Sequence, residues 1–396
     1  MRDAFAIVGG VGALGNEVAK NPALLGVGRI LLCDHDTIEI HNLTRSILFR
    51  QGDTGRPKAE VAAERLREIN PDIQVIPVVD SIGELGLGAF RRADMIFSTF
   101  DRFFPRYLIN EACLRLGKAW VDGGMSPSEH ARGGVCVYDG ADEEAFCYSC
   151  GVSPDRVADR LRQHRGFVGC HDHEKAMAAQ GVVPTTPMMA SVVGGVQTAA
   201  AVDLMLRDLP DGPEIAWPFG AWELDIRDLA ARRLNKRRRS PCYHHDLSGL
   251  QRFGDQVIEC PAWTSRDTTV DEVLARAGDD MHSRDVSIQL PENVVTIGTC
   301  DKCGARWELF KQLSTYRLCR DTLQCPRCGE GRFTADIANA MVGEIDADSA
   351  CGDRPLITCG LRPLDIVKVV RYDTLGVTTD TRYYELTGDA ALPPWA

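Results

Sequence analysis

The amino-terminal stretch AFAIVGGVGALG runs from Ala4 to Gly15. Its first half is a short apolar run that predicts a buried β-strand, and helix-like sequence follows it. Gly10, Gly12 and Gly15 form the pattern G-x-G-x-x-G at the junction. Because glycine lacks a Cβ, such a junction lets backbone amides approach phosphate groups. The stretch therefore predicts a nucleotide-binding strand–loop–helix unit.

Strand-like runs recur along the following hundred residues and alternate with helical patterns. The strand-like runs lie at 29–33, 73–79, 95–98 and 119–121, and the helical patterns lie at 58–69 and 107–116. This alternation predicts parallel strands joined by crossover helices, and hence a doubly wound, Rossmann-like α/β sheet. Asp34 follows the second strand-like run, where an acidic side chain suits the ribose hydroxyls of a nucleotide.

The residues that follow separate two kinds of nucleotide site. The chain reads D-H-D at 34–36, N-L-T-R at 42–45, G-R-P-K at 55–58 and N-P at 70–71, and Asp101 follows a later strand. A hydride-transfer enzyme has no need of Arg45 and Lys58 there. An acyl-adenylating enzyme must neutralise a triphosphate and hold magnesium while pyrophosphate leaves. We therefore favour ATP-dependent adenylation over an NAD-dependent dehydrogenase.

In their order, these motifs resemble the ThiF/MoeB/HesA family of ubiquitin-activating-type (E1-like) enzymes over about the first 250 residues. The resemblance implies ATP and Mg²⁺ as cofactors, with Asp34 on the ribose, Asp101 on the magnesium ion, and Arg45 and Lys58 at the phosphates as catalytic groups. The full cofactor-binding set that it implies is Gly10, Gly12, Gly15, Asp34, Asp36, Asn42, Arg45, Lys58 and Asp101. Arg106 and Asn110 also match family positions, and a structural role is the alternative for both.

Two positions depart from the family pattern. Ser46 stands where the family has a glutamine, and the chain begins at its first strand rather than with a helix whose arginine reaches the partner protomer's ATP. Arg2 or another subunit would have to supply that charge. Slow adenylation or a different dimer arrangement is the expected consequence.

The chain contains 15 cysteines, and several form C-x-x-C pairs. In a reducing compartment such pairs indicate zinc rather than disulfides. Cys147 and Cys150 fall where the family has its first zinc pair, and the second pair corresponds here to Cys242 and His245. The resemblance implies a structural zinc site of these four ligands. His244 is the alternative fourth ligand, and buried cysteines with a surface histidine pair are the metal-free alternative.

A second cysteine set is independent of the first. Its members are Cys300, Cys303, Cys325 and Cys328. Each pair precedes a glycine, Gly304 or Gly329, that can adopt the tight turn of a zinc knuckle. The spacing predicts a zinc ribbon that stabilises a small domain, and partner recognition is a second possible role.

Cys170 is the candidate nucleophile. It is the only cysteine of the segment at about 151–191, which corresponds to the loop that crosses the nucleotide site in the family. His171 and His173 can lower the pKa of its thiol, whereas Asp172 and Glu174 oppose that effect. The alternatives are an incidental loop cysteine and a minor metal-binding cluster.

The domains are expected at 1–250, for adenylation, and at 251–396, for an α+β domain that carries the zinc ribbon. The runs at 268–277 and 360–389 predict a strand leading into a helix and a loop leading into a hairpin. A ubiquitin-like β-grasp fold with an inserted ribbon is one way to join them. An oligomerisation or stability module explains the same pattern.

The resemblance implies adenylation of the C-terminal glycine of a ubiquitin-like or sulfur-carrier protein. The long crossover segment favours thioester formation on Cys170 and transfer to a conjugating enzyme, as in a bacterial ubiquitin-like conjugation system. The alternatives are modification of a short peptide, sulfur-carrier activation without a thioester, and a non-catalytic ATP-binding adaptor. The family is usually homodimeric, and we expect the same here.

The charge and composition of the chain limit the classes of molecule that it can bind. The formal net charge is −11, whereas a general nucleic-acid binder presents a basic face. The Arg-rich run at 232–239 is interpreted as a solvated loop or helix end, with a partner-docking patch as the alternative. No run approaches the roughly 18 consecutive apolar residues of a membrane span, and the first strand begins too early for a cleavable signal. We expect a cytoplasmic protein that engages neither membranes nor nucleic acid.

Overall fold

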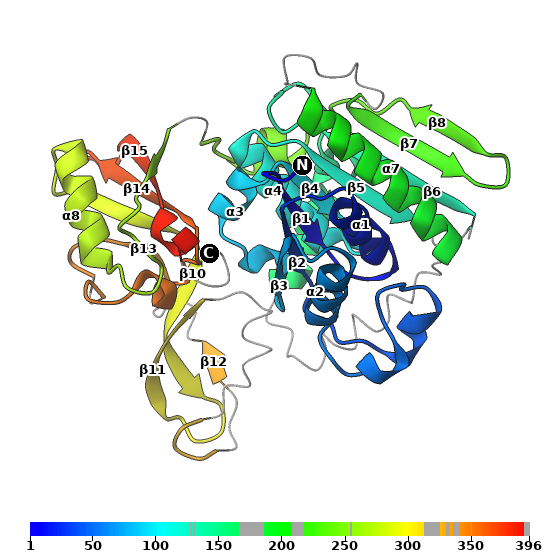
Figure 1. Cartoon of the computed structure of the whole chain (residues 1–396). Helices are drawn as coiled ribbons and strands as arrows, with labels where there is room; N and C mark the ends of the chain where they lie inside the picture. The colour runs from blue at the N-terminus through cyan, green and yellow to red at the C-terminus, as the bar shows by residue number, and fades with distance from the viewer. Residues whose placement is uncertain are drawn as a thin grey trace. The chain divides into compact units, whose positions relative to one another are not determined.

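The computed structural model describes residues 1–126, 129, 131–165, 186–207, 218–253, 256–312, 325–329, 333–335, 341–349 and 351–391 (Figure 1). The chain forms two compact units. The first contains Met1–Glu84, Phe90–Leu161 and the described residues from 186 to 253. The second contains Leu85–Ala89, the described residues 162–165 and those from 256 onward. The division near residue 254 lies close to the expected one at 250, but the short segment Leu85–Ala89 was not foreseen as part of the second unit.

The first unit is built on an eight-stranded sheet. Its strands are β1 (Phe5–Gly9), β2 (Arg29–Cys33), β3 (Gln74–Val78), β4 (Met95–Ser98), β5 (Trp120–Met125), β6 (Arg132–Tyr138), β7 (Gly220–Asp225) and β8 (Ala230–Leu234). Their order is β3-β2-β1-β4-β5-β6-β7-β8. The strands from β3 to β5 are parallel, which confirms the predicted doubly wound sheet, and β6 to β8 extend it in antiparallel fashion.

Helices follow the parallel strands as the alternation predicts. They are α1 (Ala13–Leu24), α2 (Lys58–Ile69), α3 (Leu87–Arg92) and α4 (Phe103–Leu116), while α5 (Pro154–Arg165) and α7 (Pro187–Leu206) lie in the chain between the antiparallel strands β6 and β7. Apolar side chains of α1, α2 and α7 share one continuous core with the sheet, and Figure 1 shows α1 and α7 side by side. This core fixes the end of β1 relative to α1, where the glycine loop lies.

Helix α7 is long and apolar enough to cross a membrane by length and composition, which the absence of an uninterrupted apolar run did not lead us to expect. Its residues Met189, Val193 and Ala200 are buried in the core of the first unit. Burial of this face explains the apolar composition of a core helix.

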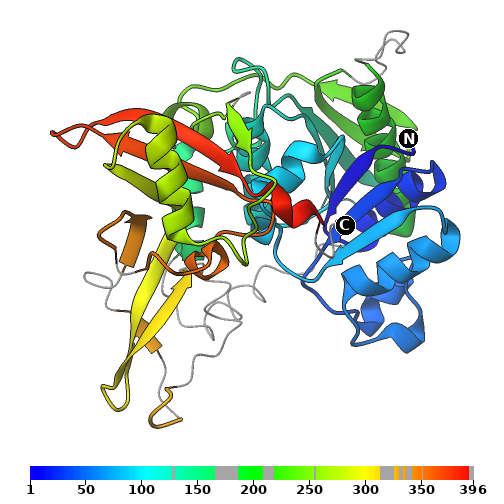
Figure 2. The same ribbon diagram turned by 60° about the vertical axis from the view of Figure 1, so that its left-hand side comes forward.

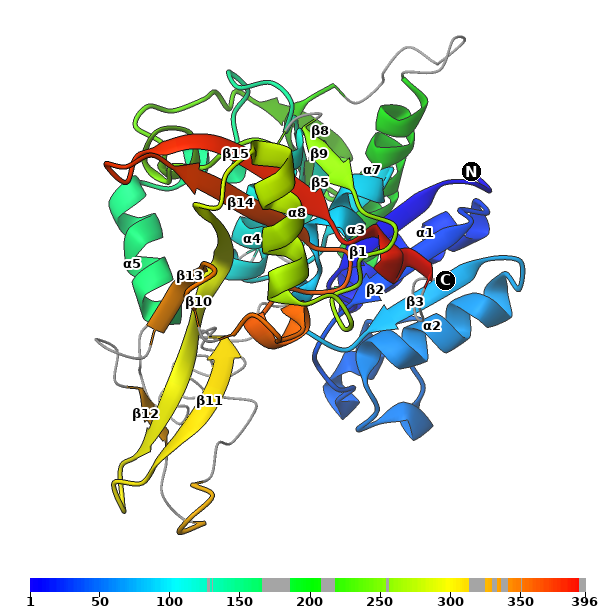
Figure 3. The same cartoon turned by 90° about the vertical axis from the view of Figure 1, so that its left-hand side faces the viewer.

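In its described residues, the second unit is a sheet with one long α-helix across it. Its elements are β9 (Val257–Glu259), α8 (Val270–Met281), β10 (Val286–Cys300), β11 (Arg306–Gln312), β12 (Phe333–Ala335), β13 (Met341–Ile345), β14 (Ile366–Tyr372) and β15 (Thr378–Glu385). The main order is β11-β10-β14-β15-β9, and β12 and β13 pair with β10. Figures 2 and 3 show α8 lying across the sheet, with the β10–β11 hairpin extending away from the helix.

The predicted C-terminal hairpin is confirmed as the antiparallel pair β14–β15. The strand expected before the helix is not formed at Thr268, because Thr269 caps α8 through its side chain and Glu272 completes the capping box. Among the described residues a single strand, β9, precedes the helix. A ubiquitin-like β-grasp would place a hairpin there, so the described topology differs from that expectation.

Candidate nucleotide site and metal centres

The glycine loop follows β1 at the carboxyl edge of the parallel strands. Gly10 has φ +89°, a left-handed conformation that favours glycine, and a Cβ on Gly15 would lie 2.1 Å from the carbonyl oxygen of Gly10. The Thr99 hydroxyl donates to the same oxygen over 2.8 Å. Gly12 is the N-cap residue of α1, where no side chain caps the helix and a Cβ would meet open space. Gly10 and Gly15 thus shape the loop, while Gly12 leaves the helix amino end open to an anion.

Asp34 is tied to this loop from the end of β2. Its Oδ2 accepts a hydrogen bond from the Val11 amide over 2.6 Å, and its Oδ1 accepts one from the Asp36 amide over 2.9 Å. Burial raises the pKa of the Asp34 carboxyl, and the Lys58 charge acts in the opposite direction. Each carboxylate oxygen retains a further lone pair, so the group can still accept a ribose hydroxyl.

Asp36 and Lys58 form the central ion pair of the site. The Lys58 Nζ lies 2.8 Å from Asp36 Oδ2, and the Lys58 amide donates to the Asp36 carbonyl over 2.9 Å. Burial raises the pKa of Asp36, but the nearby Lys58 charge and hydrogen bond outweigh it, so that the pKa is lowered overall. The Lys58 side chain is largely buried while Asp36 is exposed. The structure therefore positions the Lys58 ammonium group near the glycine loop, where it can bind a phosphate.

Asn42 and Arg45 make local contacts instead of joining this pair. The Asn42 Oδ1 accepts the Glu39 amide over 2.9 Å, and the Arg45 Nη1 donates to the His41 carbonyl over 2.9 Å. Ser46, at the departure from the family pattern, is buried. The phosphate-binding roles expected for Asn42 and Arg45 stay predictions.

Asp101 is exposed in the turn between β4 and α4. In the described part of the chain, the metal-competent carboxylates at this end are those of Asp34 and Asp36, which lie with His35 so that one ligand atom of each falls within 4.8 Å of the others. Carboxylate oxygens suit Mg²⁺. The chemistry of the donors fits the expected ion, and the role of Asp101 stays a prediction.

Sequence reasoning missed two side chains of this region. Arg102 lies close enough to Asp36 for its charge to lower the Asp36 pKa. Asn16 joins two loops, because its Nδ2 donates to the Val11 and Gly12 carbonyls over 2.9 Å and its Oδ1 accepts the Leu48 amide over 2.9 Å. A polar residue within the otherwise apolar start of α1 was the available signal for Asn16.

The side chains of Arg106 and Asn110 contact other groups of the protein. The Arg106 Nε lies 3.2 Å from Asp122 Oδ1, and its Nη2 donates to the Gly123 carbonyl over 2.9 Å. Asn110 donates to His244 Nδ1 over 3.1 Å and accepts the Tyr148 amide over 3.0 Å. Both side chains are engaged by the protein itself, which supports the structural alternative.

The first cysteine set converges as expected. The Cys147 Sγ lies 3.8 Å from Cys150 Sγ and 3.7 Å from Cys242 Sγ, and Cys150 and Cys242 are 3.6 Å apart. His245 Nδ1 lies 3.6 Å from Cys150 Sγ. In tetrahedral zinc with Zn–S of about 2.3 Å, sulfur atoms stand roughly 3.8 Å apart. The donor set and its spacing therefore fit one zinc ion.

His245 rather than His244 completes this set. The His244 Nδ1 faces Ser149 Oγ at 2.8 Å and Asn110 Nδ2 at 3.1 Å, so that nitrogen is occupied by the protein. Burial is the main cause that lowers the His244 pKa to about 4. His244, held by Ser149 and Asn110, thus positions the loop from which its neighbour His245 completes the set.

The second cysteine set closes at the tip of the β10–β11 hairpin. Cys300 and Cys328 Sγ atoms are 3.7 Å apart, and Cys303 and Cys325 Sγ atoms are 3.6 Å apart. Gly304 and Gly329 both have φ +67°, as predicted for the knuckle turns. Backbone amides of Cys303 and Arg327 donate to the first cysteine of each pair over 3.4 Å. The four thiols fit a zinc ribbon.

The candidate nucleophile, Cys170, lies outside the described residues, as do its neighbours from 166 to 185 in the crossover segment. Its assignment stays a prediction.

Comparisons with known proteins agree with this geometry. The ThiF family model matches residues 1–243. Over 234 residues the chain is 31% identical to the sulfur carrier protein ThiS adenylyltransferase of Escherichia coli K12, covering 58% of this chain and 83% of that protein. Over 221 residues it is 29% identical to ubiquitin-like modifier-activating enzyme 5 of Dictyostelium discoideum, covering 52% of this chain and 54% of that protein.

The chain thus spans about half the length of that activating enzyme. Among solved structures, E. coli MccB with ATP aligns with a TM-score of 0.47 and 20% identity, covering 63% of this chain and 67% of that one. The family match spans the whole sheet, the glycine loop and the first cysteine set through Cys242. By its sequence, its doubly wound sheet and the site at the end of that sheet, this chain belongs to the ThiF family.

Proposed function

We propose that this chain is an ATP-dependent enzyme that adenylates the C-terminal carboxylate of a small protein of the ubiquitin-like or sulfur-carrier type. The observation that carries the proposal is the Asp36–Lys58 pair, 2.8 Å apart, beside an open glycine loop in a member of the ThiF family. The named relatives are activating enzymes and adenylyltransferases.

The reaction needs charge placement more than proton transfer. A carboxylate oxygen of the acceptor attacks the α-phosphorus of ATP, the bond from that phosphorus to the bridging oxygen breaks, and pyrophosphate leaves with its electrons. The attacking group is already ionised, so no general base is required. Lys58 would exchange Asp36 for a phosphate oxygen, and the amides at Gly12 would face another. Fixed positive charge that matches the departing pyrophosphate stabilises the transition state.

Asp34 would hold the ribose, and Asp36 with Asp101 would hold Mg²⁺. Release of Lys58 from Asp36 makes one carboxylate oxygen of Asp36 available as ATP arrives. Magnesium, when bound, neutralises phosphate charge. The two cysteine sets would hold structural zinc, because neither contains a donor other than thiolate and imidazole and each supplies four ligands.

Pyrophosphate exchange tests the proposal. Purified protein with a candidate carrier and Mg²⁺ should incorporate labelled pyrophosphate into ATP, and Lys58→Ala should reduce the rate by about 10²-fold or more, since a phosphate-binding charge is lost. Lys368→Ala, on β14 of the second unit, is the matched control and should keep the rate. Equal exchange by both variants, or none by the wild type with any carrier, would refute it.

We further propose that the acyl group moves to the Cys170 thiol, with AMP as leaving group, before transfer to a conjugating enzyme. This step is supported by the place of Cys170 in the crossover segment alone. A non-reducing gel after incubation with ATP and carrier should show a thiol-sensitive adduct that Cys170→Ala loses. Cys136→Ala, at a half-buried cysteine of β6, is the control. An adduct that survives Cys170→Ala would contradict the step.

A cytoplasmic homodimer remains part of the proposal, supported by the use of cysteine in C-x-x-C pairs and by the family resemblance. Analytical ultracentrifugation tests the dimer directly.

A further inference from the structure

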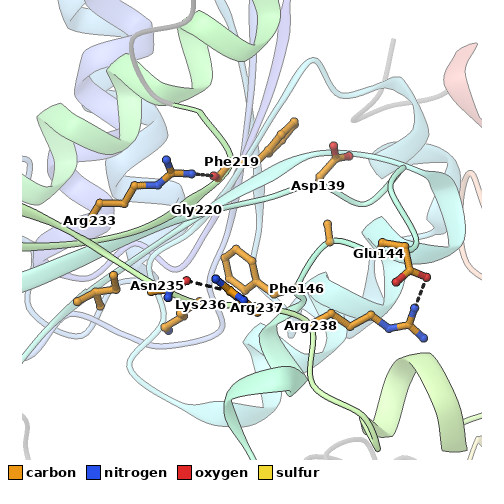
Figure 4. A pocket seen from close by; sticks show the side chains of 12 residues that line it. Asp139, Glu144, Phe146, Phe219, Gly220, Arg233, Asn235, Lys236, Arg237 and Arg238 are labelled. Carbon is orange, nitrogen blue, oxygen red and sulfur yellow. Dashed lines mark hydrogen bonds and ion pairs between the residues drawn. The ribbon is translucent and has the colours of Figure 1, made fainter.

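A pocket of about 730 Å³ lies within the first unit, where β6 and β8 end and β7 begins (Figure 4). It is lined by Asp139, Glu144, Ala145, Phe146, Phe219, Gly220, Arg233, Leu234, Asn235, Lys236, Arg237 and Arg238. Four of these residues are basic and two are acidic, so the pocket has the opposite sign to the chain as a whole, whose net charge is −11.

The pocket is distinct from the nucleotide end of the sheet. Strand β6 is antiparallel to β5, and its residue Tyr138 pairs with Trp120 at the beginning of β5. Asp139 follows Tyr138, so the pocket lies at the amino edge of the parallel strands. The glycine loop follows the carboxyl end of β1, at the opposite edge. The basic residues of the pocket are therefore not part of the ATP site.

The two acidic groups in the pocket are already occupied. Glu144 Oε1 accepts a hydrogen bond from Arg238 Nη1 over 2.5 Å. Asp139 Oδ1 accepts the Ala141 amide over 2.9 Å in a local turn. Arg238 also pairs with Asp246 at 3.1 Å, and this leaves the arginine engaged in the wall of the pocket.

In the described part of the chain, the other three cations contact neutral groups, and Lys236 Nζ lies 3.9 Å from Cys136 Sγ. Arg233 donates to the Phe219 carbonyl over 3.1 Å, and Arg237 Nε donates to Asn235 Oδ1 over 3.2 Å. No carboxylate of the described residues lies within ion-pair distance of Arg233, Lys236 or Arg237. The aromatic residues Phe146 and Phe219 also line the pocket. A pocket that combines cations with apolar rings favours an anionic ligand that carries some apolar surface.

The adjoining strand can pair with an extended chain. In the described structure, β8 is the last strand of the sheet and is bonded to β7 along one edge. Its other edge presents backbone donors and acceptors, which is the feature used in β-strand addition. Basic side chains on an edge strand also discourage aggregation. Lys236 and Arg237, however, lie beyond the end of β8 and line the pocket. Protection of the strand edge against aggregation does not explain basic residues at these two positions.

We propose that this pocket and the edge of β8 dock an acidic, extended segment of a partner protein. Carboxylates of the segment meet Arg233, Lys236 and Arg237, and its backbone follows β8. Because the site is at the edge of the sheet opposite the glycine loop, its occupant binds together with ATP instead of competing with it. The surface would bring a second protein to the enzyme without occluding the nucleotide.

Fluorescence anisotropy with a labelled (Thr-Glu)₄ peptide tests the proposal on the full chain. The wild type should bind it, excess ATP should not displace it, and a matched (Thr-Lys)₄ peptide should not bind. The variant R233E/K236E/R237E should weaken binding about tenfold or more, because three attractive contacts become repulsive. Arg276→Glu reverses the charge of an exposed arginine on α8 of the second unit, outside both the pocket and β8, and should weaken binding less than about threefold.

Circular dichroism and zinc content establish that both variants are folded. The proposal is overturned if the peptide does not bind, if the triple variant binds like the wild type, if ATP displaces the peptide, or if Arg276→Glu weakens binding as much as the triple variant. Tighter binding of an octauridylate than of (Thr-Glu)₄ would also overturn it, in favour of a nucleic-acid surface. Pyrophosphate exchange is measured separately, so loss of adenylation and loss of docking remain distinguishable.

Discussion

At the scale of single residues, the glycine loop shows what spacing can predict and what it cannot. The pattern indicated three small residues near a phosphate, but it did not distinguish their roles. Gly10 is required by its φ of +89°, Gly15 by the carbonyl 2.1 Å from its missing Cβ, and Gly12 by the open space before α1. Arg102 was missed because its proximity to Asp36 arises from the sheet, which brings the ends of two distant strands together.

Substitution of two of these glycines should separate folding from ligand binding. Gly15→Ala should destabilise the first unit by about 1–3 kcal/mol, since the methyl group meets backbone. Gly12→Ala should change the unfolding free energy by less than about 1 kcal/mol but weaken ATP binding, because the methyl group enters the open space at the helix end. Thermal denaturation and nucleotide titration check the pair. A stable Gly15→Ala, or a Gly12→Ala with unaltered ATP affinity, would contradict this assignment.

The Asp36–Lys58 pair should give the protein an acid-sensitive component of stability. The pKa of Asp36 is lowered in the fold, so the pair stabilises the protein above the usual carboxyl range, and the contribution is lost as pH falls through the folded pKa. Asp36→Asn lacks it at every pH. The Tm gap between wild type and Asp36→Asn should therefore shrink on acidification from pH 7 to about pH 3. A Tm gap that stays constant would show that the pKa of Asp36 does not differ between the folded and unfolded states.

At the scale of elements, local patterns predicted strands and helices better than their partners. Strands β1, β2 and β4 are each a short, uninterrupted apolar run, so the sequence predicted them. The antiparallel extension was not predicted, because Arg132–Tyr138 pairs with Gly220–Asp225 across a long intervening stretch. Leu85–Ala89 joins the second unit through contacts such as the Gly88 amide donating to the Leu364 carbonyl over 2.8 Å, which no local pattern signals.

The capping box of α8 should matter for the second unit. The Thr269 amide donates to Glu272 Oε2 over 2.7 Å, and the Glu272 amide donates to Thr269 Oγ1 over 3.4 Å. Thr269→Ala should cost about 1 kcal/mol of unfolding free energy. Thr374→Ala, at an exposed turn position between β14 and β15, is the matched control and should cost less than about 0.5 kcal/mol. Chemical denaturation followed by circular dichroism measures both; equal costs would argue against the cap.

At the scale of the whole molecule, each unit contains its own candidate metal centre. The second cysteine set could be recognised from its two C-x-x-C pairs, a spacing typical of metal ligands. Of the first set, only Cys147 and Cys150 have that spacing, and the family resemblance was needed to add Cys242 and His245. The choice of His245 over His244 was open between neighbours and depends on Ser149 and Asn110 occupying His244. Because the two centres lie in different units, we expect that a substitution in one set removes its metal ion without removing the other.

Metal analysis should find two zinc ions per chain. Cys242→Ser should lose one and lower the stability of the first unit, while Cys325→Ser should lose the other and leave ATP binding unchanged, because each site stabilises the unit that contains it. Inductively coupled plasma spectrometry with nucleotide titration distinguishes the two variants. Cys136→Ser, whose thiol belongs to neither set, should retain both ions. Loss of both ions from either single variant would contradict independent centres.

The first cysteine set has a consequence for chain continuity. Cys150 and Cys242 are 92 positions apart, yet their sulfur atoms lie 3.6 Å from each other. With zinc bound to both cysteines, the intervening chain, including α7, forms a closed ring that the metal ion completes. A single proteolytic cut inside that ring would open it without releasing either end, because both ends remain ligands of the same ion. In the nicked protein, zinc would join the two fragments in addition to the packing of α7 in the core, so that under denaturing conditions they would separate only after a chelator removes the metal.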